Sequence, residues 1–435
     1  MSILGIIVGL IIIGLMMLVH ESGHFIAGRL LKFKILEFQI FMGPRLFTTE
    51  KDGIKYSFRL LPIGAAVQFA GEQMDDEDED EDESYDSNDP GLFFNRPRWA
   101  RAIVVMCGPL ANFITAFLAF IIMFSAFGVS VPKLAQPIKD TLAYNTEIEA
   151  GDRLISFNNK RIRTATDLSM AEAFIDPSQT IHIVIEKPDK TKKEISLEPQ
   201  TVEQYRLGIV QNSENNTIIE VDSESNGGNP VLKENDQIIS LNGIDFTDSD
   251  VISAEINRVQ NNTLTVEVKR DGELLELTMK PTLYHDRLDF GLYFTAGEGF
   301  SDILYQSINY PISIIKSTFE GFGMIFQGKV KFSESVTGPI GIVNMFSEAV
   351  TDSSNISQMI YQLLFYFGMI SVAIGFTNLL PIPPLDGHHL LILAIEGIRR
   401  KDLSEKFKQV VSAVGMILIL GLAVLIVYFD LMRIF

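Results

Sequence analysis

The chain has 435 residues, which is long enough for several compact units. Its 36 Lys and Arg against 55 Asp and Glu give a formal charge of −19, which argues against binding of nucleic acid through a basic surface. The single cysteine excludes an internal disulfide framework and any multi-cysteine metal site. Long uncharged runs alternate with polar stretches along the sequence, and this distribution indicates a membrane protein.

The first predicted element is a transmembrane helix over 1–31. Residues 3–19 carry no charge, and the stretch lacks the basic start and the small-residue cleavage site of a signal peptide. Three further apolar segments are long enough to cross a bilayer as helices. The chain is therefore predicted to be a polytopic α-helical membrane protein with four transmembrane helices, the other three being 101–127, 356–387 and 409–435.

The connection 32–100 and the short loop 388–408 each carry several Lys and Arg, whereas both ends of the chain are nearly free of them. The positive-inside rule places both connections in the cytoplasm, and the two termini with the long region 128–355 outside. The first connection contains an acidic linker, 72–100, in which residues 72–89 hold 12 carboxylates and no Lys or Arg. We interpret this run as a solvated segment.

The first span ends in His20-Glu21-Ser22-Gly23-His24. Residues four apart on a helix lie on one face, so both imidazoles point at one spot. Such a pair suits Zn²⁺ with a third protein ligand and an open position, and Glu21 is placed to take a proton from a water there. The alternative is a pair of helix-end histidines at the membrane interface, but two His and a Glu beside an apolar run are costly unless they are functional.

The third span ends in Asn378-Leu379-Leu380-Pro381-Ile382-Pro383-Pro384-Leu385-Asp386-Gly387. Its prolines must break the helix, and Asp386 offers a hard oxygen ligand. The alternative is a plain loop at the membrane surface. Because the first and third spans run in the same direction, their ends share one leaflet, and the early part of the second span, Gly108-Pro109-Leu110-Ala111-Asn112, lies there too. The three motifs are therefore expected to meet in one layer.

These three motifs resemble the signature of the site-2 protease family of intramembrane zinc metalloproteases. The order of parts is similar to the bacterial regulator-of-sigma-E protease branch over almost the whole chain. The resemblance implies one Zn²⁺ held by His20, His24 and Asp386, with Glu21 as the catalytic base. His388 departs from the pattern, because the family usually has a glycine there, and a ligand role for it stays open. The residues expected to position substrate are Asn378, Pro381, Gly108, Pro109 and Asn112.

Segments 41–45 and 61–64 are similar to the membrane-associated β segment of that branch, which is expected over 32–71. An exposed strand there is expected to hold an unwound substrate by backbone pairing. The outer region repeats itself, because Gly151-Asp152-Arg153-Leu154-Ile155-Ser156-Phe157-Asn158 returns as Asn235-Asp236-Gln237-Ile238-Ile239-Ser240-Leu241-Asn242. Its two units, 128–212 and 213–297, resemble PDZ domains.

A PDZ groove binds an extended chain as an added strand, and Gly208 and Gly291 are the glycines expected at the two grooves. The alternative is a pair of β-rich spacers without peptide affinity. Within 298–355, residues 305–326 predict an amphipathic helix that lies on the outer membrane surface or packs on the second unit.

The resemblance implies an endopeptidase in the bacterial cytoplasmic (inner) membrane, with the PDZ-like units in the periplasm and the active site near the cytoplasmic face. Its expected partners are membrane lipid and single-pass membrane proteins that another protease has already cut, such as anti-sigma factors, and leftover signal peptides. No nucleic acid is expected. Two other classes remain open at this point: a catalytically silent membrane scaffold and an ion or metal transporter with His and Asp in its pathway.

Overall fold

In a computed structural model of the chain, the described residues are 2–72, 88–173, 175, 179–212, 215–246, 249–353 and 355–434. Most of the acidic run lies outside them. The chain divides into two compact units. The membrane unit comprises Met1–Pro132, Ile162–Glu172 and Phe294–Phe435, and the lobed unit comprises Lys133–Arg161 and Ala173–Tyr293.

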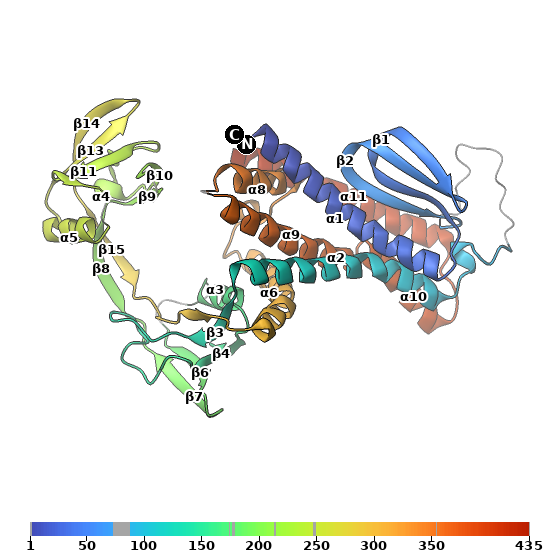
Figure 1. The fold of residues 1–435 in the computed structure, drawn as a ribbon, viewed down its shortest axis with the longest axis horizontal. Helices are drawn as coiled ribbons and strands as arrows, with labels where there is room; N and C mark the ends of the chain where they lie inside the picture. Colours follow the sequence, from blue (N-terminus) through green and yellow to red (C-terminus); the bar gives the residue numbers. More distant parts are fainter. Residues whose placement is uncertain are drawn as a thin grey trace. The chain divides into compact units, whose positions relative to one another are not determined.

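The four predicted spans are helices that are long and apolar enough to cross a bilayer. They are α1 (Ile3–Leu30), α2 (Arg98–Phe127), α9 (Ile356–Asn378) and α11 (Glu405–Ile434). α1, α2 and α9 lie side by side in the membrane unit (Figure 1). The prediction of a membrane protein with four apolar helices is confirmed.

Glycines on α1 let several elements approach its backbone. A side chain at Gly5 would meet Ser347 of α8 (Pro339–Thr351) at 2.5 Å, and one at Gly23 would meet the carbonyl oxygen of Cys107 in α2 at 2.1 Å. A membrane helix gains its packing energy from such close backbone contacts rather than from the hydrophobic effect. These glycines therefore allow α8 and α2 to pack closely against the backbone of α1.

The predicted β segment is an antiparallel pair, β1 (Ile35–Lys51) and β2 (Ile54–Phe69), which lies beside α1 (Figure 1). Both strands bend sharply, at Phe41 and Gly43 in β1 and at Gly64 in β2, where φ is positive. The bends fold the pair into four short arms. Residues 35–40 pair with 65–69 on one side and with 54–58 on the other. The arm 54–58 pairs in turn with 47–51. The arms 65–69 and 47–51 are therefore the two edges of the sheet.

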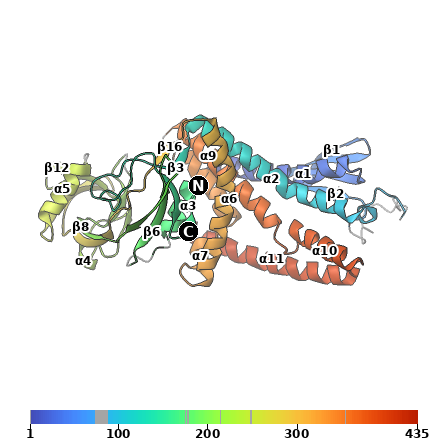
Figure 2. The same ribbon diagram turned by 90° about the horizontal axis from the view of Figure 1, so that it is seen from below.

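The amphipathic helix is α6 (Phe300–Phe326), which crosses α2 and α9 within the membrane unit (Figure 2). Its Tyr310 ring contacts Phe120 and Phe124 of α2, and its Phe319 ring lies 5.1 Å from that of Phe376 in α9. Packing on two spans thus takes up part of its apolar face.

Shorter elements complete the membrane unit. They are η1 (Phe93–Asn95), α3 (Ala165–Ala173), β16 (Phe294–Ala296), α7 (Phe332–Ser335) and α10 (Asp386–Arg399). The buried carboxylate of Asp430 in α11 accepts hydrogen bonds from the N–H groups of Gly338 and Gly341 at 3.1 and 2.9 Å, and so caps the first turn of α8. This contact ties the otherwise exposed helix α11 to the bundle.

The lobed unit contains two small β lobes. Lobe 1 (133–161, 179–197 and 288–293) is built on β4 (Arg153–Phe157), β5 (Lys160–Arg161), β6 (Ile181–Glu186) and β7 (Lys192–Leu197), with the end of β3 (Ser130–Leu134) beside β4. Lobe 2 (207–279) contains β9 (Ile209–Gln211), β10 (Ile218–Val221), α4 (Ser225–Gly228), β11 (Gln237–Leu241), β12 (Ile244–Asp245), α5 (Ser249–Val259), β13 (Leu264–Arg270) and β14 (Glu273–Met279). A ladder of β8 (Thr201–Arg206) and β15 (Thr282–Arg287) joins the lobes.

The sequence repeat is also a repeat of hydrogen bonds. In lobe 1 the buried Asp152 carboxylate accepts from the N–H of Glu149 and pairs with Lys187; in lobe 2 Asp236 accepts from the N–H of Lys233 and pairs with Arg270. The side chains of Asn158 and Asn242 likewise accept from the equivalent strand amides, both at 2.8 Å. The two lobes therefore have the same local architecture.

Lobe 2 is inserted into lobe 1. After β15 the chain returns, and the N–H groups of Leu142 and Ala143 donate to the carbonyls of Asp289 and Phe290. The Phe290 ring packs on that of Phe157 in β4 at 5.5 Å. Residues 288–293 thus complete lobe 1, although they fall within the predicted second unit, 213–297.

Candidate active site

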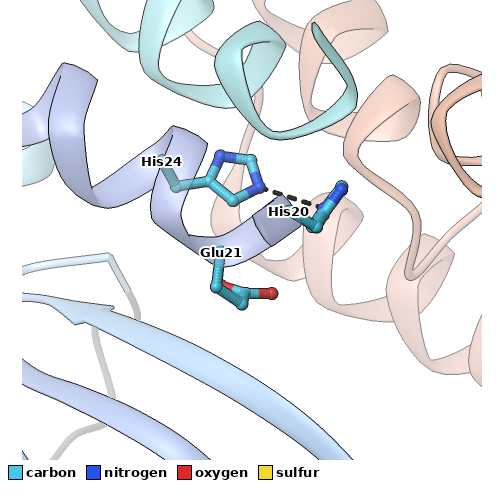
Figure 3. Close-up of side chains that lie close together, drawn as sticks. All are labelled: His20, Glu21 and His24. Carbon is cyan, nitrogen blue, oxygen red and sulfur yellow. Dashed lines mark hydrogen bonds between the residues drawn. The ribbon is translucent and has the colours of Figure 1, made fainter. Parts of the chain in front are cut away.

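The two imidazoles of the HExxH motif converge, as one helical turn between them requires. The Nε2 atoms of His20 and His24 lie 3.2 Å apart, and each residue is only 8% exposed. Figure 3 shows both rings on one side of α1, while Glu21 extends toward the β1–β2 ribbon on another side. Ligand atoms of these three residues lie within 4.8 Å of one another.

Asp386 joins this pair from the far end of the sequence. The helix α9 ends at Asn378, the proline-containing segment that follows is not helical, and α10 then begins with Asp386. The Asp386 Oδ2 atom lies 3.1 Å from Nε2 of His20 and 3.4 Å from Nε2 of His24. The predicted meeting of the first and third spans at one depth is therefore present in the structure.

The triangle of donor atoms has the size that a metal ion needs. Zinc–nitrogen bonds of about 2.0–2.1 Å in a tetrahedron place neighbouring ligand atoms about 3.3 Å apart. The three distances in the protein are 3.2, 3.1 and 3.4 Å. Asp386 Oδ2 is buried and has no hydrogen-bond donor among the described residues other than these rings. The residues therefore fit a zinc ion.

The outer nitrogen of each ring is held by α2, so that both Nε2 atoms face the centre. His24 Nδ1 lies 2.9 Å from the carbonyl oxygen of Val104, and His20 Nδ1 lies 3.1 Å from Nδ2 of the fully buried Asn112. A metal on Nε2 requires a protonated Nδ1, which donates. The amide of Asn112 is therefore best read with its oxygen toward His20, since the two ends of an amide are assigned from their hydrogen bonds.

The other residues expected to position substrate have different surroundings. A side chain at Gly108 would come within 2.2 Å of His24 Nε2, so this glycine makes room for the ligand ring, and the Pro109 carbonyl packs close to Gly375 of α9. Asn378 is the half-buried last residue of α9, and Pro381 is exposed in the break. Gly108 and Asn112 thus lie against the proposed metal ligands.

His388 follows Asp386 by two residues in α10, and its ring lies 5.7 Å from that of His389. It is 4% exposed, and within the described part of the chain its Nε2 has no hydrogen-bond partner. Three donor atoms already face one point without it. His388 is therefore not needed to complete a three-ligand set.

Two contacts of the site come from residues that sequence patterns did not indicate. One is the Val104 carbonyl, and the other is the main-chain N–H of Val67, which donates to Glu21 Oε2 over 3.2 Å. Both are backbone groups of apolar residues, so no signal in the sequence marks them. Next to Val67 a cavity of about 300 Å³ is lined by polar side chains that include Glu37, Gln39 and Gln68.

Residues 8–422 match the family described as peptidase family M50. The chain belongs to this family. Three relatives match over nearly their whole length: zinc metalloprotease RasP of Shouchella clausii, 24% identical over 98% of each chain, a predicted zinc metalloprotease of Clostridium perfringens, 25% identical over 98% of each, and one of Nostoc sp., 26% identical over 98% of this chain and 95% of the other.

Membership of the M50 family confirms the predicted site-2 protease resemblance and the assignment as a peptidase. The scaffold and transporter alternatives are set aside for the same reason. The HExxH part of α1 and the start of α10 both lie inside the matched range. The M50 match thus includes all three donor residues and Glu21.

Both glycines expected at peptide grooves lie in the lobed unit. A side chain would be crowded at both positions, because it would meet the Tyr284 hydroxyl at 2.6 Å from Gly208 and the Thr141 hydroxyl at 2.3 Å from Gly291. Gly208 lines a cavity of about 1040 Å³ in the lobed unit, between β9 and α5. An open groove is therefore present beside Gly208, in lobe 2.

Proposed function

We propose that this M50 peptidase is an intramembrane zinc endopeptidase that cleaves the membrane-spanning segments of single-pass proteins. One observation supports this above all: two imidazoles and a carboxylate from separate apolar helical segments converge within 3.4 Å, beside a glutamate. Such a donor set at the end of membrane spans is costly unless it serves a reaction.

His20, His24 and Asp386 are the proposed ligands of one zinc ion, which agrees with the names of the relatives. Zinc held by three protein ligands supplies Lewis acidity toward a water and a peptide carbonyl. Val104 and Asn112 keep the two rings turned so that both Nε2 atoms face that position.

Glu21 is the proposed general base. Its carboxylate lies within 4.8 Å of the ligand nitrogens, near enough to take a proton from a water beside them. The same group then donates this proton to the amine that leaves when the peptide bond breaks. The buried surroundings of the site keep bulk water from competing for these groups.

A substrate helix must unwind before its peptide bond is accessible. The edge arm 65–69 offers backbone groups for pairing with an extended segment, and it lies directly beside Glu21. Asn378 adds a side-chain amide at the end of α9. Backbone pairing favours no particular side chain, which suits a peptidase that accepts different membrane segments.

The Lys and Arg distribution supports placement of the active site near the cytoplasmic face, with the termini and the lobed unit on the outer side of a bacterial inner membrane. The proposed substrates are single-pass proteins that another protease has already shortened, such as anti-sigma factors, and signal-peptide remnants. Surrounding lipid covers the apolar faces of the spans.

Lobe 2 is the proposed PDZ-like peptide site. Its groove has Gly208, Ile209 and Val210 on one side and Ile252 and Ile256 of α5 on the other. An extended peptide is expected to pair with β9 and to place apolar side chains toward α5. A Ser253→Arg substitution puts a long charged side chain at an exposed position of the groove lining, and it should abolish binding of C-terminal peptides to the full chain, measured by fluorescence anisotropy.

The test of the reaction is Glu21→Gln, with a single-pass reporter in proteoliposomes. The variant should keep its zinc, because Glu21 is not a proposed ligand, yet lose cleavage. Glu298→Gln, an exposed glutamate ahead of α6, is the matched control and should cleave like the wild type. Turnover by the Glu21 variant would rule out the assigned base.

A further inference from the structure

The main-chain N–H of Val67 donates to Glu21 Oε2 at 3.2 Å, within the normal range of a hydrogen bond. Val67 lies on the edge arm 65–69, whose other side pairs with 35–40, for example Phe38 with Val67. In a central strand, the outward N–H of Val67 would bond to a further strand. Here it is directed at the Glu21 side chain of α1 instead.

Two glycines of α1 set the distance between the Val67 N–H and the Glu21 carboxylate. Gly14 and Gly28 lie about two helical turns before and after Glu21, so all three occupy the same face. A side chain at Gly14 would meet the Pro62 carbonyl at 2.5 Å, and one at Gly28 would meet the Phe69 ring at 2.4 Å. The two glycines therefore bring β2 against α1 on both sides of the Val67 contact.

We propose that the Val67 N–H is a positioning group for the proposed catalytic base. A glutamate side chain has several rotatable bonds, and a hydrogen bond to one carboxylate oxygen restricts them. With Oε2 held by β2, the other oxygen is left to face the water beside the ligands. The Val67 N–H is then committed to Glu21, and only other outward backbone groups of the edge arm are left for a substrate.

This inference rests on the proposed function, because it gives Val67 a role only through Glu21. The proposed role belongs to the backbone N–H of Val67 alone and does not depend on the Val67 side chain. It also gives Gly14 and Gly28 a purpose beyond packing, since bulk at either position would move the amide away from the carboxylate.

The direct test replaces the Val67 amide by an ester, introduced with the α-hydroxy analogue of valine. This change removes the N–H and keeps the side chain. We expect kcat to fall about tenfold to a hundredfold, with KM and zinc content unchanged. Val67→Pro removes the same hydrogen and is a second variant, because proline is tolerated at an edge strand.

Thr48→Pro is the matched control. The turn at Asp52 and Gly53 makes Lys51 and Ile54 a hydrogen-bonded pair, so the N–H of Thr48 points outward at the opposite edge of the same sheet. We expect this variant to retain the wild-type kcat. Loss of kcat in both proline variants, with a normal value in the ester, would show a fold defect and overturn the inference.

A second readout needs no turnover. Hydrogen–deuterium exchange at the Val67 amide should be slow in the full chain and at least tenfold faster in Glu21→Ala. A wild-type kcat in the ester variant, while Glu21→Gln is inactive, would overturn the positioning role and leave the proposed reaction intact. Cleavage by Glu21→Gln would instead defeat the proposed function itself.

Discussion

The Nε2 atom of His20 lies 3.1 Å from Oδ2 of Asp386, although the two residues stand near opposite ends of the chain. The contact joins the end of the first span to the first residue of α10. It exists because the break after α9 places the first residue of α10 beside the HExxH part of α1. Two segments without local connection thus form one donor set.

Removal of Asp386 should release the metal. Asp386→Ala leaves the two imidazoles without their third proposed ligand, so the purified protein should contain little zinc by mass spectrometry of metals. Asp352→Asn, at the end of α8, is the control and should keep a full complement. A normal zinc content in Asp386→Ala would remove Asp386 from the ligand set.

Asn112 should act on metal affinity through His20. Asn112→Leu removes the group that faces His20 Nδ1 and should weaken zinc binding about tenfold to a hundredfold, measured by competition with a chelator. Asn112→Asp, which keeps an acceptor for the ring N–H, should restore most of the affinity. Equal affinity in the leucine variant would show that His20 needs no support from α2.

Gly23 should be intolerant of a side chain. An added methyl group would come within 2.1 Å of the Cys107 carbonyl oxygen, so α1 and α2 must move apart. Gly23→Ala is expected to lower the free energy of unfolding by about 1–3 kcal/mol, seen as a lower melting temperature in detergent. Gly421→Ala in α11, with no atom within 4 Å of its added carbon, should melt at or slightly above the wild-type temperature.

The stability of lobe 2 should depend on acid pH through Glu255. Hydrogen bonds from Arg258 and Asn242 lower the pKa of Glu255 to about 2 from an ordinary value of 4.5. Because the pKa is depressed in the fold, its stabilisation is present above pH 4.5 and is lost as the pH falls toward 2. Hydrogen exchange of α5 should therefore accelerate over this range, and less so in Glu255→Gln.

The spans and the chemical groups of the site could be predicted from the sequence, because both depend on local rules. A run of apolar residues has the length of a bilayer whatever surrounds it, and an i, i+4 pair of histidines on a helix points one way. The proline break before Asp386 is local in the same sense. The repeat of the lobes was visible because each unit carries its own copy of the pattern.

Other features depended on contacts between distant segments. The Asn112 amide was expected to position substrate, but only the crossing of α1 and α2 brings it against His20. Similarly, the groove beside Gly208 exists only because β9 and α5, which are separate in the sequence, lie on two sides of it. No periodicity records such pairings, since they arise when elements pack.

The amino-acid sequence by itself determined that this is a membrane peptidase with an HExxH helix and a distant acidic partner. Only the tertiary structure decided that α6 packs across α2 and α9, that lobe 2 is inserted into lobe 1, and that a valine N–H holds Glu21. The reason is physical: hydropathy and helical spacing act within a segment, whereas a backbone hydrogen bond across two elements depends on how closely glycines allow them to approach.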